Sequence, residues 1–162
     1  MKVAILVAAL ILASTCASRE AANSASFDVS AKVRANCVVR SPVGLDFGTY
    51  DPHARGTVPD AISNALSIAC TKGSPGISIA LDGGESYADS HRNLRDDENH
   101  TVGYEIYTGP DHATVWNMIH TVAYVPVSSQ PTAIPLYGRV LPLLSKPEPG
   151  RYVDTLLAMV NF

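Results

Sequence analysis

Residues 25–33 read ASFDVSAKV, and this stretch decides the fold class. Every second residue is apolar, which places five apolar side chains on one face of an extended chain: Ala25, Phe27, Val29, Ala31 and Val33. Their polar neighbours fall on the opposite face. A period of two is that of a β-strand, so the stretch predicts an amphipathic strand and not a helix.

Short apolar runs of the same kind recur along the chain, bounded by Gly, Pro, Asn and Asp. We expect further strands at 66–70, 77–81, 102–106, 122–127, 134–140 and 152–162. All 11 prolines follow residue 41 and no sustained helical periodicity occurs, so long helices are excluded. The polar stretches 51–60 and 85–100 are expected to be surface loops.

These strands predict one all-β domain, an immunoglobulin-like antiparallel sandwich. The final strand has an apolar face made of Leu156, Ala158, Val160 and Phe162. No later strand follows to cover it, so we expect an incomplete sandwich with this strand as an apolar acceptor edge. Residues 25–33 then have two alternatives, which the residues leave open. They fill the gap of another copy, or they pair within their own chain as an ordinary first strand.

Residues 1–18 have the pattern of a secretory signal peptide. Lys2 precedes an apolar run of 11 residues, and small residues follow it. This run is too short for a transmembrane helix, which needs about 20 apolar residues. We expect cleavage after Ala17 or Ser18, with lipidation of Cys16 as the alternative. The predicted organisation is 1–18 signal peptide, 19–36 N-terminal strand segment and 37–162 sandwich domain.

Removal of the signal peptide leaves two of the three cysteines, Cys37 and Cys70. An even pair in an exported chain favours a disulfide. Two free thiols fit an oxidising compartment less well. A zinc site is less favoured still, because no CxxC pair occurs and the five histidines are scattered.

The composition excludes several function classes. The net charge is −3, so the chain lacks the basic surface of a nucleic-acid binder. Neither HExxH nor GxSxG occurs, so we expect no catalytic residue, no metal site and no cofactor. We interpret Asp82 as part of a strand-ending turn, the acids at 96–98 as a solvated loop and Trp116 as packing.

Six segments follow one another in an order that is specific as a set: FDVSAKVRANCVV, LDFGTYD, SIACTKGSPGISIALDGG, VGYEIYT, IPLYGRV and PGRYVDTLLAMVNF. Together they resemble the spore coat protein U domain, which also forms the subunits of archaic chaperone–usher pili. The resemblance runs from about Phe27 to Phe162. It implies an exported, disulfide-bonded, incomplete sandwich. In pilus members a periplasmic chaperone supplies the missing strand first, and the N-terminus of the next subunit replaces it.

The resemblance assigns the donor role to the apolar face of residues 25–33. Our leading hypothesis is therefore a secreted, non-catalytic structural subunit that polymerises on the cell or spore surface by donor-strand exchange. Its expected partners are related subunits, and possible further partners are a periplasmic chaperone and an outer-membrane usher. The alternative is a monomeric secreted adhesin or ligand-binding module, and a secreted hydrolase is the least favoured reading. Spore coat and pilus stay open.

Overall fold

The computed structural model describes residues 25–41, 43–51, 59–142 and 147–162. It divides the chain into a first unit, Met1–Lys32, and a second unit, Val33–Phe162, which contains all the described strands. The predicted signal peptide lies outside the described residues. Within the described ranges, no helix is long and apolar enough to cross a membrane.

The described part of the second unit contains eight strands and no helix, which confirms the all-β prediction. The strands are β1 (Cys37–Arg40), β2 (Asp60–Cys70), β3 (Ile77–Leu81), β4 (Arg92–Arg95), β5 (Thr101–Tyr107), β6 (Val122–Tyr124), β7 (Thr132–Val140) and β8 (Ala158–Asn161). The strands predicted at 77–81, 102–106 and 134–140 are confirmed to within two residues at each end.

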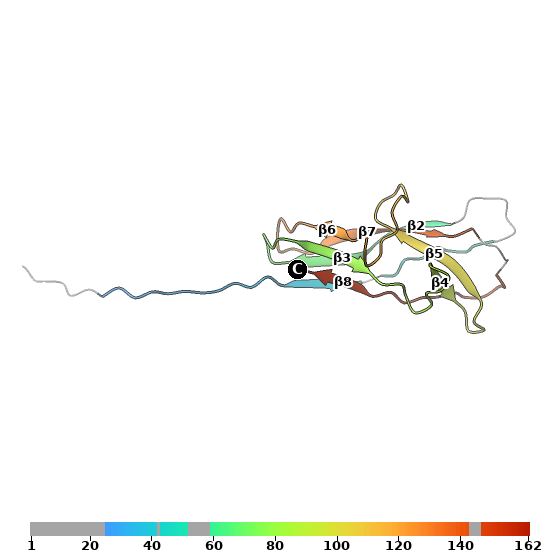
Figure 1. Cartoon of the computed structure of the whole chain (residues 1–162), viewed down its shortest axis with the longest axis horizontal. Helices are drawn as coiled ribbons and strands as arrows, with labels where there is room; N and C mark the ends of the chain where they lie inside the picture. The colour runs from blue at the N-terminus through green and yellow to red at the C-terminus, as the bar shows by residue number, and fades with distance from the viewer. Residues whose placement is uncertain (1–24, 42, 52–58, 143–146) are drawn as a thin grey trace, which may run out of the picture. The chain divides into compact units, whose positions relative to one another are not determined.

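The strands form two antiparallel sheets (Figure 1). Five strands lie in the order β1-β2-β7-β5-β4, and three lie in the order β6-β3-β8. The core between them includes Ile68 of β2, Ile79 of β3 and Trp116, which are fully buried. This arrangement confirms the immunoglobulin-like sandwich. Trp116 packs in the core as expected, and its indole N–H donates to the carbonyl of Ile79 at 2.8 Å.

The predicted disulfide is present and joins β1 to β2. Cys37 and Cys70 lie directly opposite each other in the antiparallel ladder, and a bond connects their sulfur atoms. Cys70 is buried, so the bridge lies at the edge of the core. β1 is thereby held to its sheet by a covalent bond in addition to the backbone ladder.

The prediction of a surface loop over residues 85–100 is wrong in part, because β4 lies within it. Arg92 and Asn93 are buried, although Leu94 is the only apolar residue of the strand. The Arg92 guanidinium donates to the carboxylate of Glu105 at 2.6 Å and to two backbone carbonyls, of Asp82 and Trp116. A buried charge is tolerated when it is paired and hydrogen-bonded in this way.

The predicted final strand, 152–162, is also shorter than expected. The C-terminal segment changes sheets along its length. Val153 forms an isolated bridge with Arg95 of the five-stranded sheet, whereas Ala158 lies opposite Leu81 of the three-stranded sheet. A segment that crosses between two sheets cannot pair continuously with either one, so only Ala158–Asn161 forms β8.

Three further boundaries differ from the prediction. β1 and the first half of β2 were not expected as strands. β6 ends at Tyr124 and not at 127, in keeping with Pro126, which has no N–H to donate. Residues 25–36 belong to no strand, so the strand predicted at 25–33 is not formed in this structure, and pairing of this segment within its own chain is not observed.

Replacing both cysteines tests the contribution of the disulfide. We expect the Cys37→Ser, Cys70→Ser variant to lose roughly 3–4 kcal/mol of unfolding free energy. The disulfide joins two residues that are 33 positions apart, and without it the unfolded chain regains the conformational entropy that the closed loop removes. Urea denaturation of the oxidised protein measures this change. Cys16→Ser is the matched control, because Cys16 takes no part in the disulfide, and it should leave the midpoint unchanged. Equal stability of the double variant and the wild type would contradict the assignment.

Candidate functional site

β1 and β8 are the facing edges of the two sheets, and in the described residues each pairs on one side only. β1 pairs with β2, and β8 pairs with β3. In Figure 1 the blue strand β1 runs beside the dark red β8, but no backbone ladder joins them. An edge of this kind offers free N–H and C=O groups to an incoming strand.

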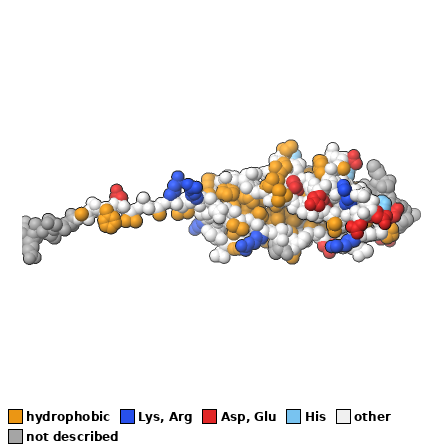
Figure 2. Space-filling view, turned by 90° about the horizontal axis from the view of Figure 1, so that it is seen from below, with side chains coloured by type: hydrophobic (Ala, Val, Ile, Leu, Met, Phe, Trp, Pro, Cys, Tyr) orange, Lys and Arg blue, Asp and Glu red, His pale blue; other side chains and the backbone are white. Residues whose placement is uncertain are grey.

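A cavity of about 450 Å³ opens between these edges. Its floor is made of core residues from the strands of both sheets: Ala65, Leu66, Leu81, Tyr104, Ile106 and Leu136. One wall comes from β1 and the residues after it, and the other from 154–158. The face of the second unit seen in Figure 2 accordingly carries hydrophobic side chains along much of its length. We give the name open groove to this cavity together with the second cavity that continues it.

The continuation is a second cavity of about 950 Å³, between segment 44–51 and segment 147–154. Leu45, Phe47 and Asp154 line both cavities, so the two form one groove. The Phe47 ring meets the Tyr104 ring edge to face, with centroids 5.8 Å apart. Gly138 faces the Leu45 and Phe47 side chains, and a Cβ there would collide with them. A glycine at this point of β7 therefore lets segment 44–51 pack against the sheet.

Of the predicted acceptor residues, Leu156 and Ala158 line this groove. Leu156, Ala158 and Val160 alternate along the C-terminal segment and pack against the core. Phe162 does not join them, because its side chain is 59% exposed. The alternation that the sequence indicated is thus present at three of the four positions.

Two aspartates, Asp82 and Asp154, bind the wall that leads into β8, a role that the residue pattern did not predict. The Asp82 carboxylate accepts hydrogen bonds from the N–H groups of Gly84 and Leu157. The Asp154 carboxylate accepts from the N–H of Glu85 and from the Tyr104 hydroxyl, the latter at 2.7 Å. Asp82 does end β3 in a turn, as predicted, but its side chain also binds a residue far along the chain.

Burial and the hydrogen bond to Asp154 keep the Tyr104 hydroxyl in its neutral form. Burial raises the pKa of the Tyr104 hydroxyl, and the hydrogen bond to the Asp154 carboxylate raises it further. The phenol therefore stays protonated and remains a donor. Gly84 has a φ of +80°, and a Cβ on it would collide with the Asp154 carboxylate. Only a glycine fits beside that carboxylate.

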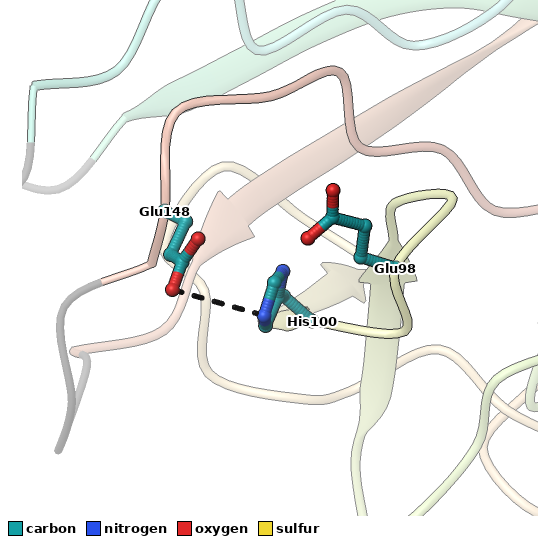
Figure 3. A group of neighbouring side chains, drawn as sticks. All are labelled: Glu98, His100 and Glu148. Atoms are coloured by element: carbon teal, nitrogen blue, oxygen red, sulfur yellow. Dashed lines mark ion pairs between the residues drawn. The ribbon is translucent and has the colours of Figure 1, made fainter.

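A group of acidic residues surrounds His100 at the turn between β4 and β5, next to segment 147–150. Glu98, His100 and Glu148 have ligand atoms within 4.8 Å of one another, and Figure 3 shows them turned toward a common space. His100 Nδ1 donates to Asp96 at 2.9 Å, and its Nε2 lies 3.9 Å from the Glu148 carboxylate. These contacts join the turn to the segment that leads into the groove wall.

The predicted donor residues lie outside the strands. Phe27, Val29 and Val33 are each more than 80% exposed, and Ala25 and Ala31 are exposed as well. An extended segment that exposes five apolar side chains at a period of two has the form of an unpartnered amphipathic strand.

Comparison with known proteins agrees with this geometry. A model of the Spore Coat Protein U domain matches residues 23–159. The chain belongs to the Spore Coat Protein U domain family. The match includes both walls of the open groove and all of the predicted donor segment, 25–33. No curated protein matches the sequence of this spore coat U domain protein.

A solved structure shares the fold. It is the crystal structure of the CsuC-CsuE chaperone–tip adhesion subunit pre-assembly complex from the archaic chaperone–usher Csu pili of Acinetobacter baumannii. The TM-score is 0.57 at 19% sequence identity, and the match covers 80% of the spore coat U domain chain. It covers 40% of the other chain, so the present chain spans about two fifths of that length. At this identity the likeness shows the fold alone.

The contacts of His100 predict a pH dependence of stability. The hydrogen bond to Asp96 and the nearby Glu148 and Glu98 raise the pKa of His100 above its ordinary value of 6.5. Because the pKa of His100 is higher in the folded state than in the unfolded state, protonated His100 stabilises the fold. This contribution is fully present below pH 6.5, and it is lost as the pH rises through the folded-state pKa. We expect the thermal midpoint of the wild type to fall more between pH 5.5 and pH 8.5 than that of His100→Gln. Thermal unfolding followed by circular dichroism measures both.

His120→Gln is the matched control for this experiment. His120 is exposed and has no carboxylate among its described contacts. Its replacement should leave the pH profile as in the wild type. Superimposable profiles of the wild type and His100→Gln would show that the Asp96 contact does not act in this way.

Proposed function

We propose that this spore coat U domain protein is an exported, non-catalytic structural subunit that polymerises by donor-strand exchange. The observation that carries the proposal is the open groove, where two unpaired strand edges flank an apolar floor. A strand added between such edges forms backbone hydrogen bonds to both of them, and its alternate side chains enter the floor. Residues 25–33 of another copy have the pattern that this groove requires.

The donor segment and the groove are complementary in side-chain character. The residues of the C-terminal segment that line the open groove are 147–158, a longer stretch than the nine residues of the donor segment 25–33. The donor presents one large side chain, Phe27, among smaller Ala and Val residues. Most of the groove floor is aliphatic, so each donor side chain that enters it leaves water for an apolar surface.

The proposal includes the route and the partners. Residues 1–18 act as the secretory signal peptide, and Cys37 and Cys70 are oxidised after export. An exposed apolar groove favours aggregation, so we propose that a periplasmic chaperone covers it before another copy does. An outer-membrane usher is the further partner of this route, and the product lies on the cell or spore surface.

Substitution of the largest donor residue tests strand donation. Phe27→Ala removes a side chain whose burial contributes roughly 2–3 kcal/mol, so we expect subunit association to weaken roughly 30- to 150-fold. Deletion of residues 19–33 should abolish association. Gel electrophoresis of unboiled samples measures the ladder of multimers, and light scattering of the purified protein measures the association.

Ser30→Ala is the matched control, because Ser30 lies on the opposite face of the same segment. It should assemble like the wild type. A ladder of multimers that persists after deletion of residues 19–33 would contradict strand donation. A protein that purifies as a stable soluble monomer with a protected groove would instead support the monomeric adhesin or binding module.

A further inference from the structure

The second unit carries an acidic end. The turn between β4 and β5 holds Asp96, Asp97 and Glu98, and Glu148 lies beside it (Figure 3). The cationic neighbours in the described sequence are Arg95, Arg151 and, when it is protonated, His100, so the four carboxylates still exceed the positive charges. Figure 2 shows acidic side chains gathered toward the right-hand end of the molecule. We call this group of four carboxylates the acidic end.

Arg34 and Lys72 form a basic end. The two residues lie close together because Thr71 Oγ1 bonds to the carbonyl of Arg34 and the Thr71 N–H donates to the carbonyl of Asn36. The segments that meet here are 34–36, 71–76 and 125–131, and none of them contains Asp or Glu.

The strand register places these two ends at opposite ends of the sandwich. Thr132 at the start of β7 lies opposite Ile68, next to the basic end. Val140 at the other end of β7 lies opposite Tyr104, next to the turn that carries the acidic end. β7 spans nine residues, about 27 Å, so the two charged groups do not neutralise each other within one molecule.

We propose that the acidic end of one copy binds the basic end of the next copy, so that consecutive subunits dock end to end through opposite charges. This inference rests on the proposed strand donation, and it adds a second contact between the same two copies. The partner is a second copy of this chain, because its basic end is complementary in charge to the acidic end.

The short connector between the donor strand and β1 brings the basic end of the donor copy close to one end of the acceptor groove. Only residues 34–36 separate Val33, the last donor residue, from Cys37. Four extended steps span at most about 14 Å, so the donor's basic end must lie next to whichever groove end holds Val33. The groove therefore determines which surfaces of the two copies meet.

Charge selects one of the two possible directions of the donor. β8 and the segment before it run from the acidic end, where Val153 meets Arg95, to the basic end, where Asn161 lies opposite Ser78. A donor strand antiparallel to β8 brings Val33 and the following Arg34 to the acidic end. A donor strand parallel to β8 brings two basic ends together. Only the antiparallel direction joins opposite charges.

Exposed charges at the margin of an interface act mainly on the association rate and its salt dependence. We therefore expect Glu98→Gln, Glu148→Gln to slow polymerisation roughly threefold to tenfold at 20 mM salt. The difference should shrink below about twofold at 1 M salt, where charges are screened within about 3 Å. Arg34→Gln, Lys72→Gln should behave in the same way. Light scattering of the purified full chain gives the rates.

Charge reversal makes the test specific. Glu98→Lys, Glu148→Lys alone should slow polymerisation further, and adding Arg34→Glu, Lys72→Glu to the same chain should restore the rate to within about twofold of the wild type. Asp89→Asn, Asp111→Asn is the matched control, because it removes two exposed carboxylates that belong to neither charged group. Thermal midpoints of all variants separate a change in assembly from a change in folding.

The outcomes separate this inference from strand donation. Polymers that need residues 19–33 but form at the same rate in all charge variants would overturn the end-to-end contact and leave strand donation standing. Failure of the combined reversal to recover the rate of the acidic-end reversal would overturn the contact as well. Polymers that persist without residues 19–33 would contradict donation itself.

Discussion

The unpaired edges of β1 and β8 above an apolar floor are the constraint on which the rest of the structure depends. The floor residues belong to the same core that holds the two sheets together, so the groove cannot be made polar without weakening the sandwich. Whatever covers it must satisfy backbone hydrogen bonds on two sides and supply apolar side chains inward. An extended strand with a period of two meets both requirements, whereas a helix meets only the second.

The walls of the groove are held by different means. On one side the disulfide ties β1 to β2, and on the other Asp82 and Asp154 bind the segment that leads into β8. Some Cα atoms of β1 and β8 lie within 8 Å of each other, while an inserted strand needs about 9.5 Å between its two neighbours. β1 and β8 therefore have to move apart slightly when a strand enters between them. This movement costs free energy, which the burial of the incoming apolar side chains then offsets.

The parts of the fold that follow from local pattern were predictable, and those that depend on distant partners were not. The alternation of residues 77–81 predicts β3 without further information. β4 was not predicted because its buried residue is a charged one, Arg92. Its burial depends on the Glu105 carboxylate and on two backbone carbonyls that lie far away in the sequence. The same limit applies to the site. Alternation identified the wall residues such as Leu156, but the floor combines four strands, and the role of Asp154 depends on Tyr104, 50 positions earlier.

The contacts of residues 34–36 bear on whether residues 25–33 pair with their own chain or with another copy. A return of residues 25–33 into their own groove beside β1 would require a hairpin turn over residues 34–36. Asn36 is instead bound to Thr71 in both directions, through its N–H and its carbonyl, and Thr71 also bonds to the carbonyl of Arg34. These bonds continue the pairing of β1 with β2 and keep the connector extended. Pairing in the same chain would break them, whereas pairing with a second copy leaves them intact, so the local hydrogen bonding favours exchange between molecules.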